Sequence, residues 1–201
     1  MGRIYAVDSY VLIEGLANRD GDLYHRLRDF GRYLEQSHSI LMLPTPVLAE
    51  YLQGPPSKHG SWNLIRARHD VRHLLQASRV ADVTELAAFR CAEMARGQSG
   101  MEARIAMERA LRDKGASSRA ARQMVKMDWL IMATCEAAGV TTIFTNEGEA
   151  EKWSRFVAGT LKKLSVEPWT KMPRPAPSET EPAPELESPK PTQTDLFPSS
   201  D

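Results

Sequence analysis

Short apolar runs alternate with longer amphipathic stretches along most of this chain. The runs at 3–7 (RIYAV), 39–44 (SILMLP) and 141–145 (TTIFT) are almost continuously apolar, which is typical of strands buried on both faces of a sheet. Two weaker runs, 78–83 (SRVADV) and 163–168 (KLSVEP), predict short additional strands. We therefore expect about five short strands, each separated from the next by helical sequence.

The segments between these runs carry apolar residues at three- and four-residue steps, which predicts amphipathic helices. Thr45 and Thr84 are expected as helix caps, and Pro46 and Gly54 are placed as start and stop residues of one helix. The predicted helices cover residues 9–18, 22–36, 45–53, 62–76, 84–97, 101–114, 127–139 and 149–161. This alternation of strands and helices predicts an α/β fold with a mainly parallel sheet.

Length and composition favour one compact domain with an appendage. The chain has 201 residues, of which 42% are hydrophobic, enough for a substantial core. We place the domain at 1–170 and a tail at 171–201. The net charge of zero is unevenly divided, because residues 176–201 hold six acids and one base, whereas the first 175 residues hold 25 bases and 20 acids. A mildly basic body permits a polyanionic partner, although an ordinary basic domain explains it equally well.

The chain gives no sign of secretion or membrane insertion. Cys91 and Cys135 both fall in predicted helices, and two such cysteines form neither a disulfide framework nor a zinc site. Arg3 and Asp8 interrupt any apolar run that could act as a signal peptide, and no stretch approaches membrane-spanning length. These features predict a cytoplasmic protein with no membrane partner.

Four acidic residues stand where a parallel sheet would form a ligand site, beyond the carboxyl ends of its strands. Asp8 ends the first strand, Glu50 lies in the helix after the second, and Glu147 follows the strand at 141–145. Asp128 stands at the start of the apolar helix predicted at 127–139, among residues that belong in a core. Each acid also has a simpler interpretation: Asp8 and Asp128 as helix-terminus residues, Glu50 and Glu147 as solvated side chains.

Taken together, the segments VDSYVLI, TPVLAEYL and KMDWLIMATCEAAGVTTIFTNE resemble the PIN-domain nucleases, the family that contains the VapC-type ribonuclease toxins. The resemblance runs from residue 4 to about residue 166. It implies a Rossmann-like α/β/α sandwich with acids gathered at one end of the sheet. Relative to a minimal toxin, residues 97–121 form a helical insertion, whose role could be a dimer face, a lid or simple elaboration.

The resemblance also implies roles for individual residues. Asp8, Glu50 and Asp128 match the three principal metal-binding acids, and Glu147 matches the fourth position, although the neighbouring Asn146 leaves that ligand open. Ser9 and Thr145 match polar residues that support the cluster. In this interpretation Asp8, Glu50, Asp128 and Glu147 are both catalytic residues and metal ligands.

The expected chemistry follows from these carboxylates. Crowded acids raise one another's pKa unless a cation compensates, and hard oxygen ligands suit Mg²⁺ or Mn²⁺. Such ions orient a water molecule and stabilise charge on a phosphodiester, with either one ion or two. The resemblance therefore implies a metal-dependent nuclease acting on single-stranded nucleic acid, with RNA favoured over DNA. It also implies, as an alternative, a toxin held inactive by an antitoxin, and a homodimer fits equally well.

The tail has a composition that cannot form a core. Eight of the thirteen prolines lie from residue 173 onward, which predicts a disordered, extended spacer. Within it, QTDLF at 193–197 resembles the short motif by which bacterial proteins bind the replication sliding clamp. The resemblance places Gln193 in a polar subsite and Leu196 and Phe197 in an apolar pocket, with Asp195 between them. Burying both apolar side chains would contribute roughly 3–5 kcal/mol before ordering costs, which suits micromolar binding.

Overall fold

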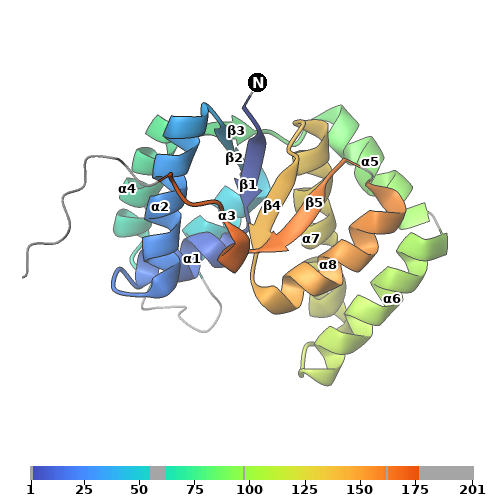
Figure 1. The fold of residues 1–201 in the computed structure, drawn as a ribbon. Coiled ribbons are helices and arrows are strands. Elements are labelled where there is room, and N and C mark those ends of the chain that lie inside the picture. The colour runs from blue at the N-terminus through green and yellow to red at the C-terminus, as the bar shows by residue number, and fades with distance from the viewer. Residues whose placement is uncertain (1, 55–61, 97, 162, 177–201) are drawn as a thin grey trace, which may run out of the picture.

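The chain forms a five-stranded sheet in which every neighbouring pair of strands is parallel. The computed structural model describes residues 2–54, 62–96, 98–161 and 163–176. Its strand order is β3-β2-β1-β4-β5, with β1 in the centre (Figure 1). The strands are β1 (Ile4–Val7), β2 (Ile40–Pro44), β3 (Arg79–Ala81), β4 (Thr142–Thr145) and β5 (Ser165–Pro168). The predicted α/β fold with a parallel sheet is confirmed.

Helices connect successive strands, as parallel pairing requires. Figure 1 shows α4 toward the β3 edge of the sheet and α6 and α8 toward the β5 edge. Within the described residues the α-helices are α1 (Ser9–Ala17), α2 (Asp22–Ser37), α3 (Thr45–Gln53), α4 (Leu64–Ala77), α5 (Glu85–Arg96), α6 (Gln98–Asp113), α7 (Ser118–Ala137) and α8 (Glu147–Thr160).

An aromatic cluster holds α2 against the centre of the sheet. The Phe30 ring meets Tyr5 of β1 and Phe144 of β4 edge-on, with both pairs of ring centroids 5.4 Å apart. All three residues are almost fully buried. Because edge-on aromatic pairs add about 0.5–1.5 kcal/mol each to their apolar burial, this cluster fixes α2 over β1 and β4. The register of these strands, in which Val7 pairs with Phe144, ends β1 and β4 at the same edge.

Helix α7 is longer than the sequence pattern predicted. The prediction began this helix at residue 127, but α7 runs from Ser118 to Ala137 and is capped by the Ser117 hydroxyl, which accepts from Ala120 N at 3.2 Å. No glycine or proline interrupts these twenty residues. The polar first half of α7 hid its continuity with the apolar second half. Asp128 therefore lies in the middle of a helix rather than at its start, and it is no cap.

Two predicted helix starts also shift. Thr45 was predicted as the cap of α3, but it is the first residue of the helix, and its hydroxyl donates instead to Ala81 O and Asp82 Oδ1, at 3.1 and 3.0 Å. Helix α8 begins at Glu147 rather than at residue 149, with Asn146 as its cap. The Thr84 cap is confirmed, since its hydroxyl accepts from Ala87 N at 3.2 Å.

The inserted segment forms α6, which packs along the outside of the domain. It contacts α5, α7 and α8, and Figure 1 shows it beside α8. At the other end of the chain, packing continues past residue 170. Arg26 of α2 donates to Thr170 O at 2.8 Å, and Met172 is buried. Residues 177–201 lie outside the described residues, so the predicted spacer and its QTDLF motif do too.

Two further features of the described residues are the state of the cysteines and the apolar character of the helices. Cys91 and Cys135 are both free thiols, one partly and one fully buried. Within the part of the chain that the structure describes, no helix combines the length and apolar character needed to cross a membrane.

Candidate active site

Asp8 occupies the carboxyl end of the central strand and is held from two directions. Its Oδ1 accepts from Ser9 N at 2.7 Å, so it caps α1, and its Oδ2 accepts from the Thr145 hydroxyl at 2.8 Å. Burial raises the pKa of Asp8 to about 6, and the charges of Glu50 and Glu149 act in the same direction, while both hydrogen bonds oppose the shift. Capping alone needs neither this burial nor these acidic neighbours.

Glu50 approaches Asp8 from α3, the helix that follows β2. Its side chain is partly buried, and this burial raises the pKa of Glu50, while a hydrogen bond with the Ser9 side chain lowers it. Ser9 thus contacts both Asp8 and Glu50. Two of the residues predicted to support the acids, Ser9 and Thr145, therefore lie in direct contact with them.

Asp128 comes from the opposite direction, on α7. Burial raises its pKa well above the ordinary range, and the charges of Asp8, Glu149 and Glu50 act in the same direction. Only Lys152, among the causes of this shift, lowers it. Trp129 and Ile131 nearby on the helix are buried in the core, which draws Asp128 inward with them. A buried carboxylate among other acids is unfavourable for stability, so its position suggests a functional demand.

The fourth acid of the cluster is Glu149, which the sequence interpretation did not single out. Glu149 raises the pKa of both Asp8 and Asp128, whereas the predicted Glu147 is not among the causes of either shift. Glu147 is the first residue of α8 and is exposed to solvent. Two residues along a helix turn a side chain through roughly 200°, so Glu147 and Glu149 face opposite directions. Asn146 is a residue type that often caps helices, and it was the sequence feature that could have indicated a helix start at residue 147. That start determines the direction in which each of the two glutamates points.

Asn146, the other residue predicted near this position, has a structural role here. Its side-chain Oδ1 accepts from Glu149 N at 2.8 Å, which caps α8 and fixes the backbone of Glu149 beside the cluster. Its oxygen therefore already has a backbone partner. The arrangement places Asn146 as a residue that positions Glu149.

Lys152 brings a positive charge to these acids. Its Nζ donates to both carboxylate oxygens of Glu149, at 2.8 and 3.0 Å, one turn apart on α8. Both side chains are 29% exposed, so the ion pair stands at the rim of the cluster rather than in its interior. The carboxylates of Asp8, Glu50, Asp128 and Glu149 thus outnumber the positive charge that this lysine supplies.

The donor set fits a hard divalent cation in its chemistry. Carboxylate oxygens are the ligands that Mg²⁺ and Mn²⁺ prefer, and a cation would offset the repulsion that raises these pKa values. In the conformation of the described residues, no three acidic, histidine or cysteine side chains come close enough together to hold one ion. An ion held directly by three or more of these acids would therefore require side chains such as the Lys152-paired Glu149 to move.

A cysteine nucleophile is not the chemistry of this site. Cys135 lies two turns along α7 from Asp128 and is fully buried. Burial, with a further contribution from the Asp8 charge, raises the pKa of the Cys135 thiol, so it stays protonated and unreactive. The acids therefore remain the candidate functional groups at this edge of the sheet.

Comparison with known proteins gives fold neighbours only. No protein-family profile matches this chain, and no curated protein sequence does either. The solved structures that match in fold include the DNA-bound VapBC of Salmonella typhimurium and VapBC-1 of nontypeable Haemophilus influenzae. The fold is that of a VapBC chain. The TM-scores are 0.51 and 0.50, at 14% and 16% identity, over 84% of this chain and 99% of the other chain in both cases.

Proposed function

We propose that this protein is a metal-dependent PIN-domain nuclease that hydrolyses phosphodiester bonds in single-stranded nucleic acid, with RNA favoured. One observation carries the proposal: the charges of Glu50 and Glu149 raise the pKa of both Asp8 and Asp128 at the carboxyl edge of a parallel sheet. The fold shared with the VapBC chains supports it. Buried, mutually repelling acids in such a crevice are expected of a functional site and are unfavourable for stability alone.

The side chains have distinct parts in this proposal. Asp8, Glu50, Asp128 and Glu149 would hold Mg²⁺ or Mn²⁺, which would activate water and stabilise charge on the phosphodiester. Thr145 and Ser9 orient the Asp8 carboxylate through hydrogen bonds, and Asn146 positions Glu149. Partial burial of Asp128 weakens the solvation of its charge, which raises its pKa. The chain thus arranges oxygen donors and leaves the chemistry to the cation.

The decisive experiment is cleavage of labelled single-stranded RNA and DNA with Mn²⁺, Mg²⁺ or EDTA. We expect Mn²⁺-dependent cleavage that Asp8→Asn and Asp128→Asn each reduce at least 100-fold. Asp20→Asn, a change to an exposed acid outside the cluster, is the matched control and keeps full activity. Cleavage that persists in EDTA, or in both cluster variants, would contradict the proposal.

A second candidate is a toxin whose activity an antitoxin controls. It is favoured by the VapBC complexes that share the fold, and by an apolar cavity of about 570 Å³. Leu27, Phe30 and Leu74 are among its lining residues, so α2 and α4 flank it. An antitoxin segment with apolar side chains would bury this surface. Expression of the chain alone should then arrest growth, and co-expression of the neighbouring gene product should relieve the arrest, whereas harmless expression of an active nuclease would count against a toxin.

Tethering to the sliding clamp is a separate part of the proposal and rests on the sequence of the tail alone. Gln193, Leu196 and Phe197 would engage a preformed groove, with Asp195 between them, while the proline-rich spacer holds the nuclease body nearby. Tethering would raise the concentration of the active site on nearby strands without any new contact by the folded domain. Binding by the peptide alone is the direct test, and it is developed in the Discussion.

A further inference from the structure

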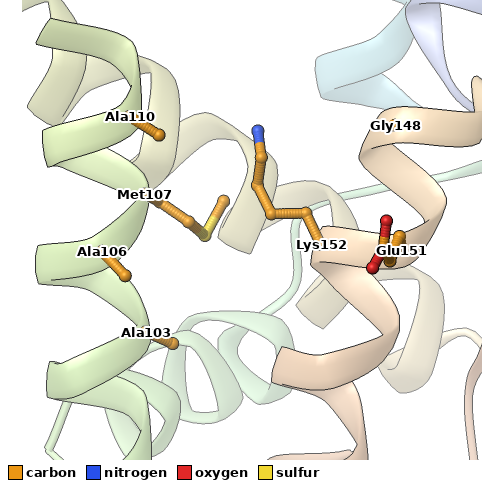
Figure 2. Close-up of a pocket in the computed structure, with 7 residues that line it drawn as sticks. All are labelled: Ala103, Ala106, Met107, Ala110, Gly148, Glu151 and Lys152. Atoms are coloured by element: carbon orange, nitrogen blue, oxygen red, sulfur yellow. The ribbon is translucent and has the colours of Figure 1, made fainter. Parts of the chain in front are cut away.

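A groove of about 410 Å³ lies between the inserted helix α6 and helix α8, at the rim of the acid cluster (Figure 2). Its volume falls in the range of small-ligand sites, about 300–1,000 Å³. Helix α6 supplies one wall and the first turns of α8 supply the other. The residues that line it are Ala103, Ala106, Met107, Ala110, Gly148, Glu151 and Lys152.

Three alanines with short side chains leave space along the α6 wall of the groove. Ala103, Ala106 and Ala110 recur at spacings of three and four, which places them on one face of the helix. Alanines at such positions usually let two helices pack closely, but here they border a cavity instead. The Met107 side chain, 4% exposed, forms an apolar surface between them. The result is an apolar slot between two helices that contact each other elsewhere along their length.

The slot is continuous with the acid cluster through one side chain. Figure 2 shows Lys152 extending from α8 into the space between the two helices. The same Nζ pairs with Glu149 at 2.8 Å, and the lysine charge lowers the pKa of Asp128. Gly148, which precedes Glu149, lines the slot at its other wall. A ligand lying in the slot would therefore reach the four carboxylates past this lysine.

An unstacked nucleobase fits this combination of features. A base is flat and largely apolar on its faces, which suits a slot with apolar walls, and a lysine beside the slot suits the phosphate attached to the base. Resting on the nuclease function proposed above, we infer that the α6–α8 groove binds one base of the substrate next to the phosphodiester at the acids, with Lys152 as a phosphate-positioning residue. Extracting a base from a duplex costs a few kcal/mol, so this groove gives a preference for single strands.

The test separates base binding from hydrolysis. A single-stranded oligonucleotide carrying 2-aminopurine fluoresces more strongly when that base leaves its stack, so its titration in EDTA reports base capture without turnover. We expect a fluorescence increase with the unmodified protein and its loss in Ala106→Phe, which fills the groove. Ile105→Phe is the matched control, because Ile105 is the preceding residue, is 51% exposed and does not line the groove.

Turnover supplies the second measurement. A single-stranded oligomer of abasic residues is a phosphodiester without any base or aromatic ring. Hydrolysis of this oligomer by the Ala106→Phe variant should stay within twofold of the unmodified rate, while the KM of the variant for the ordinary oligonucleotide rises at least tenfold. Ala110→Leu, a smaller obstruction, should give a rise of intermediate size. Equal losses on both substrates, or unchanged binding and KM in a folded Ala106→Phe protein, would overturn the inference. Absence of all hydrolysis by the unmodified protein would contradict the nuclease proposal, while the fluorescence titration would still decide base binding.

Discussion

The Thr145 hydroxyl donates a 2.8 Å hydrogen bond to Asp8 Oδ2, joining two residues that are 137 positions apart in the chain. Both are buried, and each stands at the end of its strand, β4 or β1. The bond exists because parallel pairing of these strands brings their carboxyl ends to the same edge. It opposes the rise in the pKa of Asp8 that burial causes, and so favours the charged carboxylate.

Thr145→Val should therefore weaken both stability and activity. Valine keeps the shape of threonine but leaves the buried Asp8 carboxylate without this donor, which typically costs about 1–3 kcal/mol. We expect a lower free energy of unfolding in urea and at least tenfold slower Mn²⁺-dependent cleavage. Thr145→Ser retains the hydroxyl and should stay close to the unmodified protein in activity. Equal behaviour of the valine and serine variants would show that the hydrogen bond has no such role.

Substitutions at Glu149 and Glu147 should decide which is the fourth acid. Glu149 influences Asp8 and Asp128, while Glu147 is exposed on another face of α8. We expect Glu149→Gln to lower Mn²⁺ affinity in calorimetric titration, and to reduce cleavage at least tenfold. Glu147→Gln is the matched control on the same helix turn and should change either quantity less than twofold. A large effect of Glu147→Gln with little effect of Glu149→Gln would instead favour Glu147, the residue that the resemblance implies.

Asp128→Asn should stabilise the protein when no metal is bound. Burial and repulsion from Asp8, Glu149 and Glu50 raise the pKa of Asp128, so ionising this carboxyl costs more in the folded state than in the unfolded state. The pKa of Asp128 is higher in the folded state than in the unfolded state. The resulting destabilisation is therefore absent at low pH and grows as the pH rises above the ordinary pKa of an aspartate. In EDTA at pH 7.5 we expect Tm to rise by about 2–4 °C, the shift that ~1 kcal/mol gives in a chain of this size.

The control for that prediction is the pH itself. At low pH the Asp128 carboxyl is protonated and therefore neutral, like the amide that replaces it in the Asp128→Asn variant. The two melting temperatures should then approach each other in differential scanning calorimetry. A lower Tm for Asp128→Asn in EDTA across the whole pH range would mean that the carboxylate stabilises the fold. The proposed conflict between stability and function at this residue would then be wrong.

The clamp-binding prediction can be tested without the folded domain. A labelled peptide of residues 189–201 should bind a purified bacterial sliding clamp at micromolar concentration, because an extended segment entering a preformed groove needs no support from the body. Leu196→Ala with Phe197→Ala should remove this binding and leave cleavage of free oligonucleotides unchanged. Asp8→Asn should do the reverse. Absence of peptide binding at tens of micromolar would mean that the motif serves another partner or none.

The pattern of residues along the chain was enough to determine the main elements of the fold. Apolar runs located β1, β2 and β4, because a strand buried on both faces needs apolar residues at every position. Strand ends then identified Asp8, since carboxyl ends of parallel strands form sites. Glu50 and Asp128 required the additional resemblance to the PIN family, because an acid inside a helix has no distinctive local pattern.

Only the tertiary structure decided which acids lie near Asp8 and Asp128 and what surrounds them. The charge of Glu149, and not that of Glu147, raises the pKa of both residues. Helix α8 begins at residue 147 and turns about 100° per residue, so these two glutamates face nearly opposite directions. Asp128 is partly buried because α7 is one continuous helix packed in the core, and its polar first half concealed this. The groove between α6 and α8 depends on how two helices from distant parts of the chain lie side by side, and local residue patterns do not determine such long-range packing.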